Sequence, residues 1–269
     1  MQILTCTLIQ TKLFWEDAAA NRKMFEEKTN SIKERTEVVI LPEMFSTGFS
    51  MKPEALAETM NGETVAWMKH TASRKKIILT GSLMIKEDDN YYNRLIWMLP
   101  NGNYGWYDKR HLFAYGDEHN HYSAGNKRLI ASVKGWKINL QVCYDLRFPV
   151  WSRQTPSPEN GYDAEMEYDV LIYVANWPER RSLAWKTLLQ ARAIENQCYV
   201  IGVNRVGDDG NNFYHSGDSM VIGPLGEIMY HKKDDEDVFT IELNKEHLET
   251  IRKKFPFWRD ADNFTVTNE

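Results

Sequence analysis

The stretch VLIYV at residues 170–174 is short, apolar and rich in β-branched side chains. These properties favour a buried strand over a buried helix. A stretch with helical spacing follows at residues 182–196, and a second strand-like run, YVIGV, occupies residues 199–203. The order strand, helix, strand indicates a sheet with helices packed on its face.

The same alternation extends through the rest of the chain. Further strand-like runs lie at residues 3–9, 38–41, 77–81, 95–99, 138–142 and 219–222, and further helical stretches at residues 17–35 and 63–75. Each half ends in a hairpin, with turns at residues 100–102 and 223–226. We therefore predict an α/β fold: a four-layer αββα sandwich of two mixed sheets with helices on the outer faces.

The chain offers no obvious domain boundary. No linker rich in Gly, Pro or Ser separates its halves, so we expect a single domain over residues 1–269. Residues 154–167 are interpreted as a surface insertion, and Ser182 as the N-cap of the helix that follows it. The tail at about 244–269 carries one helix and the aromatic cluster FPFW at residues 255–258, which we expect to dock on the body or on a partner subunit.

Composition limits the classes of partner. Hydrophobic residues make up 42% of the chain and charged residues 26%, with a formal net charge of −5 and scattered basic residues. Nucleic acid and anionic membrane are therefore not expected as partners, and no apolar stretch approaches the roughly 20 residues of a membrane span. The N-terminal residues lack the basic region of a signal peptide. Three widely spaced cysteines give no disulfide framework, so we expect free thiols and a cytoplasmic location.

Three reactive side chains stand where strand-like runs end. Glu43 follows VVILP at residues 38–42, Lys109 follows GWYD at residues 105–108, and Cys143 follows INLQV at residues 138–142. The ends of strands are where α/β proteins place their sites. Each residue alone also has an ordinary reading, namely a solvent-facing Glu, a surface Lys and a buried inert Cys.

Taken together, these contexts resemble the carbon–nitrogen hydrolase (nitrilase) superfamily. The resemblance rests on LPEMF at residues 41–45, DK at 108–109 and CYDLRFP at 143–149, with further matches at 122–125, 176–178, 191–196 and 217–219. Within the superfamily the chain is most similar to the bacterial ω-amidase branch. The resemblance implies a fourth functional residue, Glu118, between the lysine and the cysteine.

The resemblance also implies a mechanism. Cys143 would attack an amide carbon and form a thioester, and Glu43 would accept the thiol proton, because a thiol with a pKa of about 8.5 must lose its proton to attack well. Lys109 and the backbone N–H of Tyr144 would bind the tetrahedral oxyanion. Glu118 would orient or relay the proton of the hydrolytic water.

The substrates implied are short dicarboxylate monoamides such as 2-oxoglutaramate and 2-oxosuccinamate, which would give the 2-oxo dicarboxylate and ammonia. A distal carboxylate needs a cation, and Arg180 and Arg181 are candidates, with solvated loop arginines as the alternative. Arg147 is expected to form a structural ion pair.

Four further residues complete the predicted substrate pocket. Phe45, Phe49, Asn176 and Trp177 are expected to line it. The resemblance implies no cofactor, and His119 with His121 is weak evidence for a metal because no third ligand lies near them in the sequence. A homodimer is expected by resemblance to the family.

Other readings stay open at this point. The same motif would serve another amidase, an N-carbamoyl hydrolase or a nitrilase. A papain-like Cys–His pair is a rival, since the chain has seven histidines. A catalytically silent binding or scaffold protein could share the fold.

Overall fold

Two β-sheets packed face to face form the centre of the molecule. The computed structural model describes residues 2–154, 166–262 and 264–267. In the first sheet the strand order is β13 (Asp237–Asn244), β1 (Ile3–Gln10), β2 (Val38–Ile40), β3 (Ile78–Glu87), β4 (Asn90–Met98) and β5 (Tyr104–Asp108). Strands β1, β2 and β3 run parallel and the other pairs are antiparallel, so this sheet is mixed.

The second sheet repeats this plan. Its strand order is β10 (Val206–Asp208), β11 (Tyr214–Ile222), β9 (Tyr199–Asn204), β8 (Val170–Ala175), β7 (Trp136–Val142) and β6 (Leu129–Val133), with β12 (Ile228–Lys233) paired to β11. Strands β7, β8 and β9 are parallel and their neighbours antiparallel. This sheet is mixed as well.

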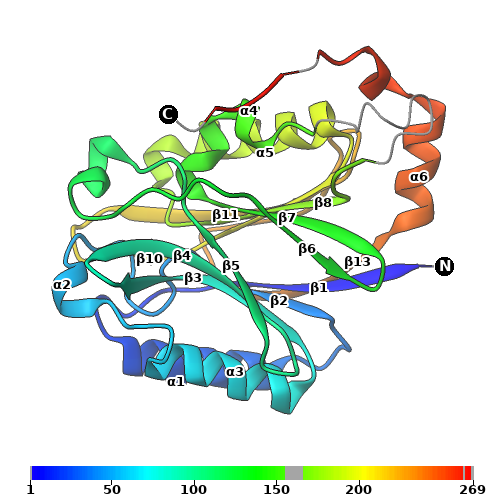
Figure 1. Ribbon diagram of the computed structural model, residues 1–269. Coiled ribbons are helices and arrows are strands. Elements are labelled where there is room, and N and C mark those ends of the chain that lie inside the picture. Colours follow the sequence, from blue (N-terminus) through cyan, green and yellow to red (C-terminus); the bar gives the residue numbers. More distant parts are fainter. Residues whose placement is uncertain (1, 155–165, 263, 268–269) are drawn as a thin grey trace.

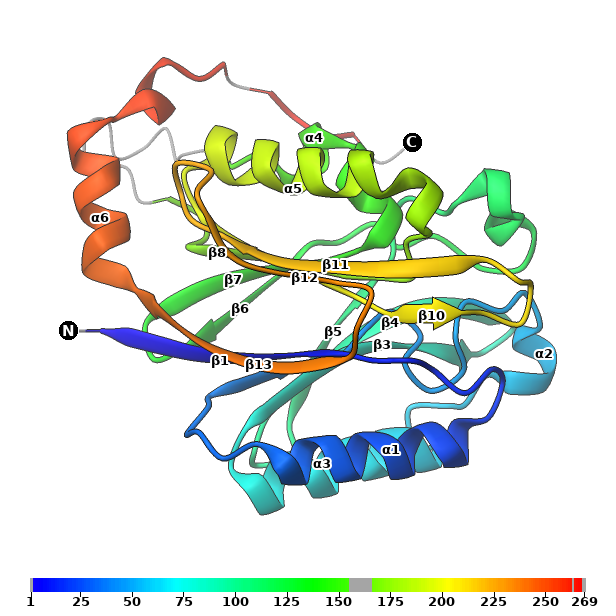
Figure 2. The same ribbon diagram turned by 180° about the vertical axis from the view of Figure 1, so that it is seen from behind.

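Helices cover the outer face of each sheet. Figures 1 and 2 show α1 (Ala18–Ser31) and α3 (Glu63–Lys75) on the outer side of the first sheet, and α5 (Ser182–Asn196) on the outer side of the second. The short helix α2 (Pro53–Leu56) lies near one end of the first sheet, and α4 (Pro149–Ser152) lies beside α5 on the outer side of the second. The predicted αββα sandwich is confirmed.

Most predicted elements are present, with changed ends. Every strand-like run forms a strand, and the hairpin turns connect β4 to β5 and β11 to β12. Strands β6, β10 and β13 were not identified from the sequence, because they are short or carry partly exposed side chains. The predicted insertion at residues 154–167 falls almost wholly outside the described residues.

Two helix starts differ in detail from the prediction. The first helix begins after Asp17, whose Oδ1 accepts a hydrogen bond from the Ala20 N–H at 2.9 Å, and it already ends at Ser31. Ser182 is the first residue of α5, and Arg181 occupies the N-cap. The Ser182 hydroxyl instead donates to Asp218 Oδ2 at 2.8 Å, which ties α5 to β11.

The C-terminal segment is attached by ion pairs and by the buried side chains of Leu248 and Ile251. Helix α6 (Lys245–Lys254) places Lys245 and Arg252 each 3.0 Å from a carboxylate oxygen of Asp169, next to β8. In the aromatic cluster that follows, Phe257 is 61% exposed. Helix α6 rather than this ring therefore holds the segment on the body.

Phe45 belongs to the core and not to a pocket, contrary to the prediction. Its ring lies between Phe25 and Trp67, with ring centroids at 5.4 and 5.9 Å, and none of its surface is exposed. A Cβ added at Gly81 would lie 2.8 Å from the Phe45 ring, so the first sheet has a glycine where this ring packs.

No helix in the described ranges is long and apolar enough to cross a membrane.

Truncation of Phe45 tests this placement. We expect Phe45→Ala to lower the free energy of unfolding by about 3–5 kcal/mol, because it leaves a cavity in the layer between α1, α3 and the first sheet. Phe14→Ala, at a ring that is 54% exposed, is the matched control and should change it by roughly 0.5 kcal/mol or less. Urea denaturation measures both, and equal losses in the two variants would contradict a core position for Phe45.

Candidate active site

The two sheets bring three reactive side chains to one place. Glu43 follows β2, Lys109 follows β5, and Cys143 follows β7. Glu43 and Lys109 are completely buried, and Cys143 is 9% exposed. Glu118, in the 3₁₀ turn Glu118–Asn120, is also completely buried. All four residues therefore meet inside the protein, at the carboxyl ends of the strands.

The backbone is strained at two of these strand ends. Met44 and Cys143 have φ angles of 42° and 44°, in the left-handed region that non-glycine residues seldom adopt. The Met44 N–H donates to Ser82 Oγ at 2.8 Å, which fixes the first turn. Such strain persists only where the surroundings hold it, and it is frequent at active sites.

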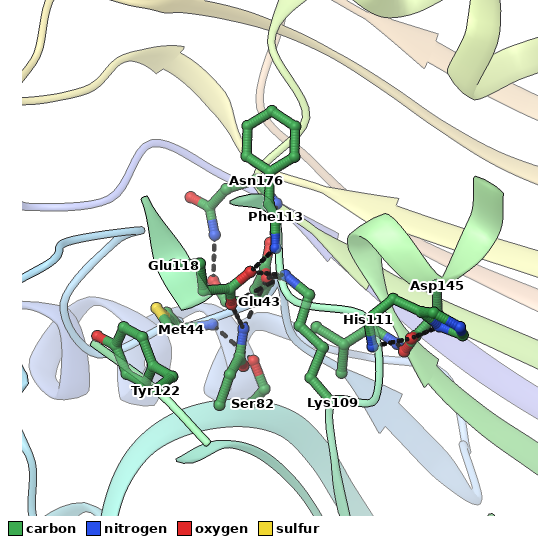
Figure 3. Close-up of polar contacts among 12 residues, drawn as sticks. Glu43, Met44, Ser82, Lys109, His111, Phe113, Glu118, Tyr122, Asp145 and Asn176 are labelled. Atoms are coloured by element: carbon green, nitrogen blue, oxygen red, sulfur yellow. Dashed lines mark hydrogen bonds and ion pairs between the residues drawn. The ribbon is translucent and has the colours of Figure 1, made fainter. Parts of the chain in front are cut away.

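Asp145 holds the turn that carries Cys143. Its Oδ2 accepts hydrogen bonds from the Val142 N–H at 3.0 Å and from the Tyr107 hydroxyl at 2.7 Å. Its Oδ1 accepts from the His111 N–H at 3.0 Å and lies 2.8 Å from His111 Nδ1. The side chain thus ties the end of β7 to β5 and to the segment after it. Figure 3 shows its contact with His111.

Lys109 lies between two carboxylates (Figure 3). Its Nζ is 3.0 Å from Glu43 Oε1 and 2.8 Å from Glu118 Oε2. The Asn176 backbone N–H donates to Glu43 Oε2 at 2.8 Å, and the Phe113 N–H donates to Glu118 Oε2 at 2.6 Å. These bonds fix the direction of both carboxylates.

Burial and mutual charge set the protonation states. Burial alone lowers the pKa of the Lys109 ammonium, but the carboxylates of Glu118 and Glu43 outweigh it and raise this pKa above its ordinary value. Burial raises the pKa of the Glu118 carboxyl, and the charge of Glu43 adds to that effect. Burial, then the charge of Glu43, raises the pKa of the Cys143 thiol, although Lys109 opposes them. Cys143 therefore rests as a neutral thiol.

Of the side-chain charges near the Cys143 thiol, that of Glu43 has the strongest effect on the thiol pKa, which it raises. A papain-like enzyme has an imidazole in that position. The carboxylate is therefore the group placed to take the thiol proton, which weighs against the Cys–His alternative. Within the described ranges, no three His, Cys, Asp or Glu side chains gather as ligands for a metal ion.

A cavity opens in front of the thiol, and aromatic and cationic side chains line it. The predicted residues in its wall are Phe49, Cys143, Tyr144, Asn176, Trp177, Arg180 and Arg181. Glu43, Lys109 and Glu118 lie behind this wall. The wall residues that the sequence analysis did not predict include Met51, Phe113, Tyr115, Arg147, Asp209, Asn211, Phe213 and His215.

Each of the three arginines lies over an aromatic ring. The guanidinium carbon of Arg147 is 5.0 Å from the centre of the Trp177 ring, that of Arg180 is 4.4 Å from Phe213, and that of Arg181 is 5.1 Å from Phe113. Arg147 forms no ion pair with any of the described residues, so the predicted structural ion pair is not found among them. Arg147 faces the cavity because the 3₁₀ turn that begins at Cys143 carries it there.

The sequences of known proteins that match this chain belong to enzymes with the chemistry that this site suggests. The family model for carbon-nitrogen hydrolases matches residues 5–253. The chain is 45% identical to omega-amidase YafV of Escherichia coli strain K12 over 98% of both chains, and 30% identical to 2-oxoglutaramate amidase of Bacillus subtilis strain 168 over 95% of this chain and 96% of that one.

A solved structure shows that the fold is also shared. The crystal structure of XC1258 from Xanthomonas campestris, a CN-hydrolase superfamily protein with an arsenic adduct in its active site, superposes with a TM-score of 0.96. It is 43% identical, and the match covers 99% of this chain and 100% of that one. Its sequence, its fold and the residues gathered around Cys143 all show that this chain belongs to the carbon–nitrogen hydrolase family.

Proposed function

We propose that the protein is an ω-amidase that hydrolyses short dicarboxylate monoamides such as 2-oxoglutaramate and 2-oxosuccinamate to the 2-oxo dicarboxylate and ammonia. The observation that carries the proposal is the Cys143 thiol beside buried Glu43, at the base of a cavity with three guanidinium groups in its wall. The similarity to an omega-amidase and to a 2-oxoglutaramate amidase supports the choice of substrate.

The first half of the reaction forms a thioester. As the Cys143 sulfur attacks the amide carbon, Glu43 takes the thiol proton, so a thiolate need not accumulate at rest. Lys109 Nζ and the Tyr144 backbone N–H are the proposed donors to the oxyanion, and each such donor typically contributes about 3–4 kcal/mol. Protonated Glu43 then passes its proton to the departing nitrogen, and ammonia leaves.

The second half releases the acid. Water takes the place of ammonia, Glu43 accepts a proton from it, and the hydroxyl oxygen attacks the thioester carbon. The proton returns to the sulfur as the acid leaves. Glu118 acts through Lys109: its two oxygens hold the ammonium at 3.0 and 2.8 Å and so keep it directed toward the reacting atoms.

Arg181 is the proposed partner for the distal carboxylate, with Arg180 nearer the cavity mouth. Arg181 is partly buried, whereas Arg180 is exposed. Burial lowers the pKa of Arg181, the charges of Arg180 and Arg147 lower it further, and the charge of a Cys143 thiolate opposes them. An anion placed among these cations would relieve their repulsion.

The cavity wall also carries one acidic side chain, which is already engaged. Asp209 Oδ1 accepts hydrogen bonds from the Asn211 and Phe213 backbone N–H groups, at 2.8 and 2.9 Å. The described residues form no ion pair with Arg180 or Arg181. Both guanidinium groups are therefore available to a substrate carboxylate.

We also infer a single carbon–nitrogen hydrolase domain over residues 1–269, a homodimer and a cytoplasmic location. Leu183 and Ile194 of α5 are 78% and 54% exposed, which supports a partner subunit over that helix. The free cysteines of the described ranges are buried thiols, as suits a reducing compartment.

A panel of substrates tests the proposed activity. We expect the kcat/KM for ammonia release from 2-oxoglutaramate to exceed that from glutamine, from a simple aliphatic amide, from an N-carbamoyl amino acid and from a short nitrile by roughly 10-fold or more. Glutamine brings an ammonium group toward the arginines, the aliphatic amide and the nitrile lack a carboxylate, and the N-carbamoyl amino acid has its carboxylate at a different distance from the reacting carbon. Glu43→Gln, which keeps the shape but removes the base, gives the background rate. Preference for any other member of the panel would contradict the ω-amidase proposal.

Replacing each arginine by methionine tests the carboxylate partner. Arg181→Met should raise the KM for 2-oxoglutaramate roughly 10- to 100-fold, since it removes a charge-assisted hydrogen bond worth about 1.5–3 kcal/mol. The KM for an uncharged amide should change little. Arg180→Met is the matched control, with an expected change of a few fold. Equal effects on charged and uncharged amides would rule out a carboxylate-binding role for Arg181.

A further inference from the structure

Asn93, in the middle of β4, contacts both buried carboxylates. Its Nδ2 lies 2.8 Å from Glu43 Oε1 and 3.2 Å from Glu118 Oε1, and its side chain is completely buried. The amide nitrogen has two hydrogens, so it can donate one to each carboxylate. Lys109 Nζ bridges the same two carboxylates, so one charged and one neutral donor join them.

The orientation of the amide follows from chemistry. If the group were turned over, its oxygen would face two carboxylate oxygens and repel both. In the orientation present, Asn93 Oδ1 is buried and has no hydrogen-bond partner among the described residues. An unpaired buried carbonyl oxygen is unfavourable. The side chain of Asn93 therefore keeps both N–H hydrogen bonds to the carboxylates while its carbonyl oxygen goes without one.

The charges around the two carboxylates show how the Asn93 N–H groups affect their ionisation. Two carboxylates share one ammonium, so with both ionised the buried cluster is negative. Glu43 faces Lys109 from the end of β5, Glu118 from its 3₁₀ turn and Cys143 from the end of β7. The Tyr122 hydroxyl lies farther away and donates to the Ser50 carbonyl oxygen. Of these, only Lys109 favours the ionised carboxylate by its charge. A neutral donor helps to keep both carboxylates ionised without adding charge.

The same bonds set the direction of Glu43. Its Oε1 accepts from Lys109 Nζ at 3.0 Å and from Asn93 Nδ2 at 2.8 Å, which occupies both lone pairs of that oxygen. Its Oε2 accepts from the Asn176 N–H at 2.8 Å and keeps one lone pair for the thiol proton. Asn93 thus leaves Oε2 as the oxygen that serves Cys143.

We propose that Asn93 is a positioning residue that keeps the Glu43 carboxylate ionised and turned toward the Cys143 thiol. The proposal rests on the proposed function of Glu43 as the base. The backbone does not depend on this side chain, because the Lys109 N–H donates to the Asn93 carbonyl oxygen at 3.0 Å whatever residue stands there. Side-chain variants therefore retain the pairing of β4 with β5.

Two variants and a matched control form the test. Asn93→Leu has a similar size and no donors, and Asn93→Asp has the same shape but adds a negative charge when ionised. Asn139→Leu is the control: Asn139 is equally buried in β7, and its amide has no partner among the described residues. Circular dichroism and the unfolding temperature establish that each variant is folded.

The readout is the pH dependence of two rates. One is kcat/KM for 2-oxoglutaramate. The other is the rate of Cys143 alkylation by iodoacetamide, which depends on Glu43 as the base but involves no hydrolysis of an amide bond. Loss of the donor favours protonated Glu43, so the acidic limb of both profiles should move to higher pH by about 1–2 pH units in Asn93→Leu, and further in Asn93→Asp. At neutral pH, kcat should fall roughly 10- to 100-fold with little change in KM. The control should match the wild type.

The possible outcomes separate the two proposals. Acidic limbs that stay in place in a folded Asn93 variant, or a change in KM alone, would overturn the role of Asn93. If Asn93→Leu does not fold, Asn93→Ser, which keeps one donor, should show a smaller shift in the same direction, and no shift there would overturn it equally. If the alkylation limb moves while no amide of the panel is hydrolysed, the role of Asn93 stands and the ω-amidase proposal fails.

Discussion

The structure depends on one ammonium group held between two buried carboxylates. Lys109 Nζ lies 3.0 Å from Glu43 and 2.8 Å from Glu118, and none of these side chains is exposed. Taking three charges out of water costs several kcal/mol for each, and only close pairing and added hydrogen bonds recover it. The backbone N–H groups of Asn176 and Phe113 supply such bonds. Because each partner stabilises the others, loss of one leaves an uncompensated buried charge.

The fold serves this cluster by making strands from both sheets end at the same point. Glu43 and Lys109 come from the first sheet, and Cys143 comes from the second. The left-handed turns at Met44 and Cys143 direct side chains inward where a regular strand would continue. Asp145 then holds the Cys143 turn through four contacts to β5, β7 and His111. Packing between the sheets, more than any local preference, fixes the site.

Much of the fold and the centre of the site could be predicted from the sequence. Short apolar runs identify the inner strands, and the motifs around Glu43, Lys109 and Cys143 identify the family. Other features depend on three-dimensional contacts. Asn93 stands inside an ordinary strand pattern, and the position of β4 between β3 and β5 brings it to the two carboxylates. Phe45 is two residues from Glu43, yet the turn at Met44 sends its ring into the core.

The central claim is that the amide carbon becomes bonded to Cys143. Rapid acid quench of the enzyme during turnover of 2-oxoglutaramate, followed by proteolysis and mass spectrometry, measures this directly. The account predicts that the peptide with Cys143 gains the mass of the substrate less ammonia, and that Cys143→Ala shows neither this gain nor turnover. An acyl group on Cys6 or Cys198, or full turnover by Cys143→Ala, would contradict it.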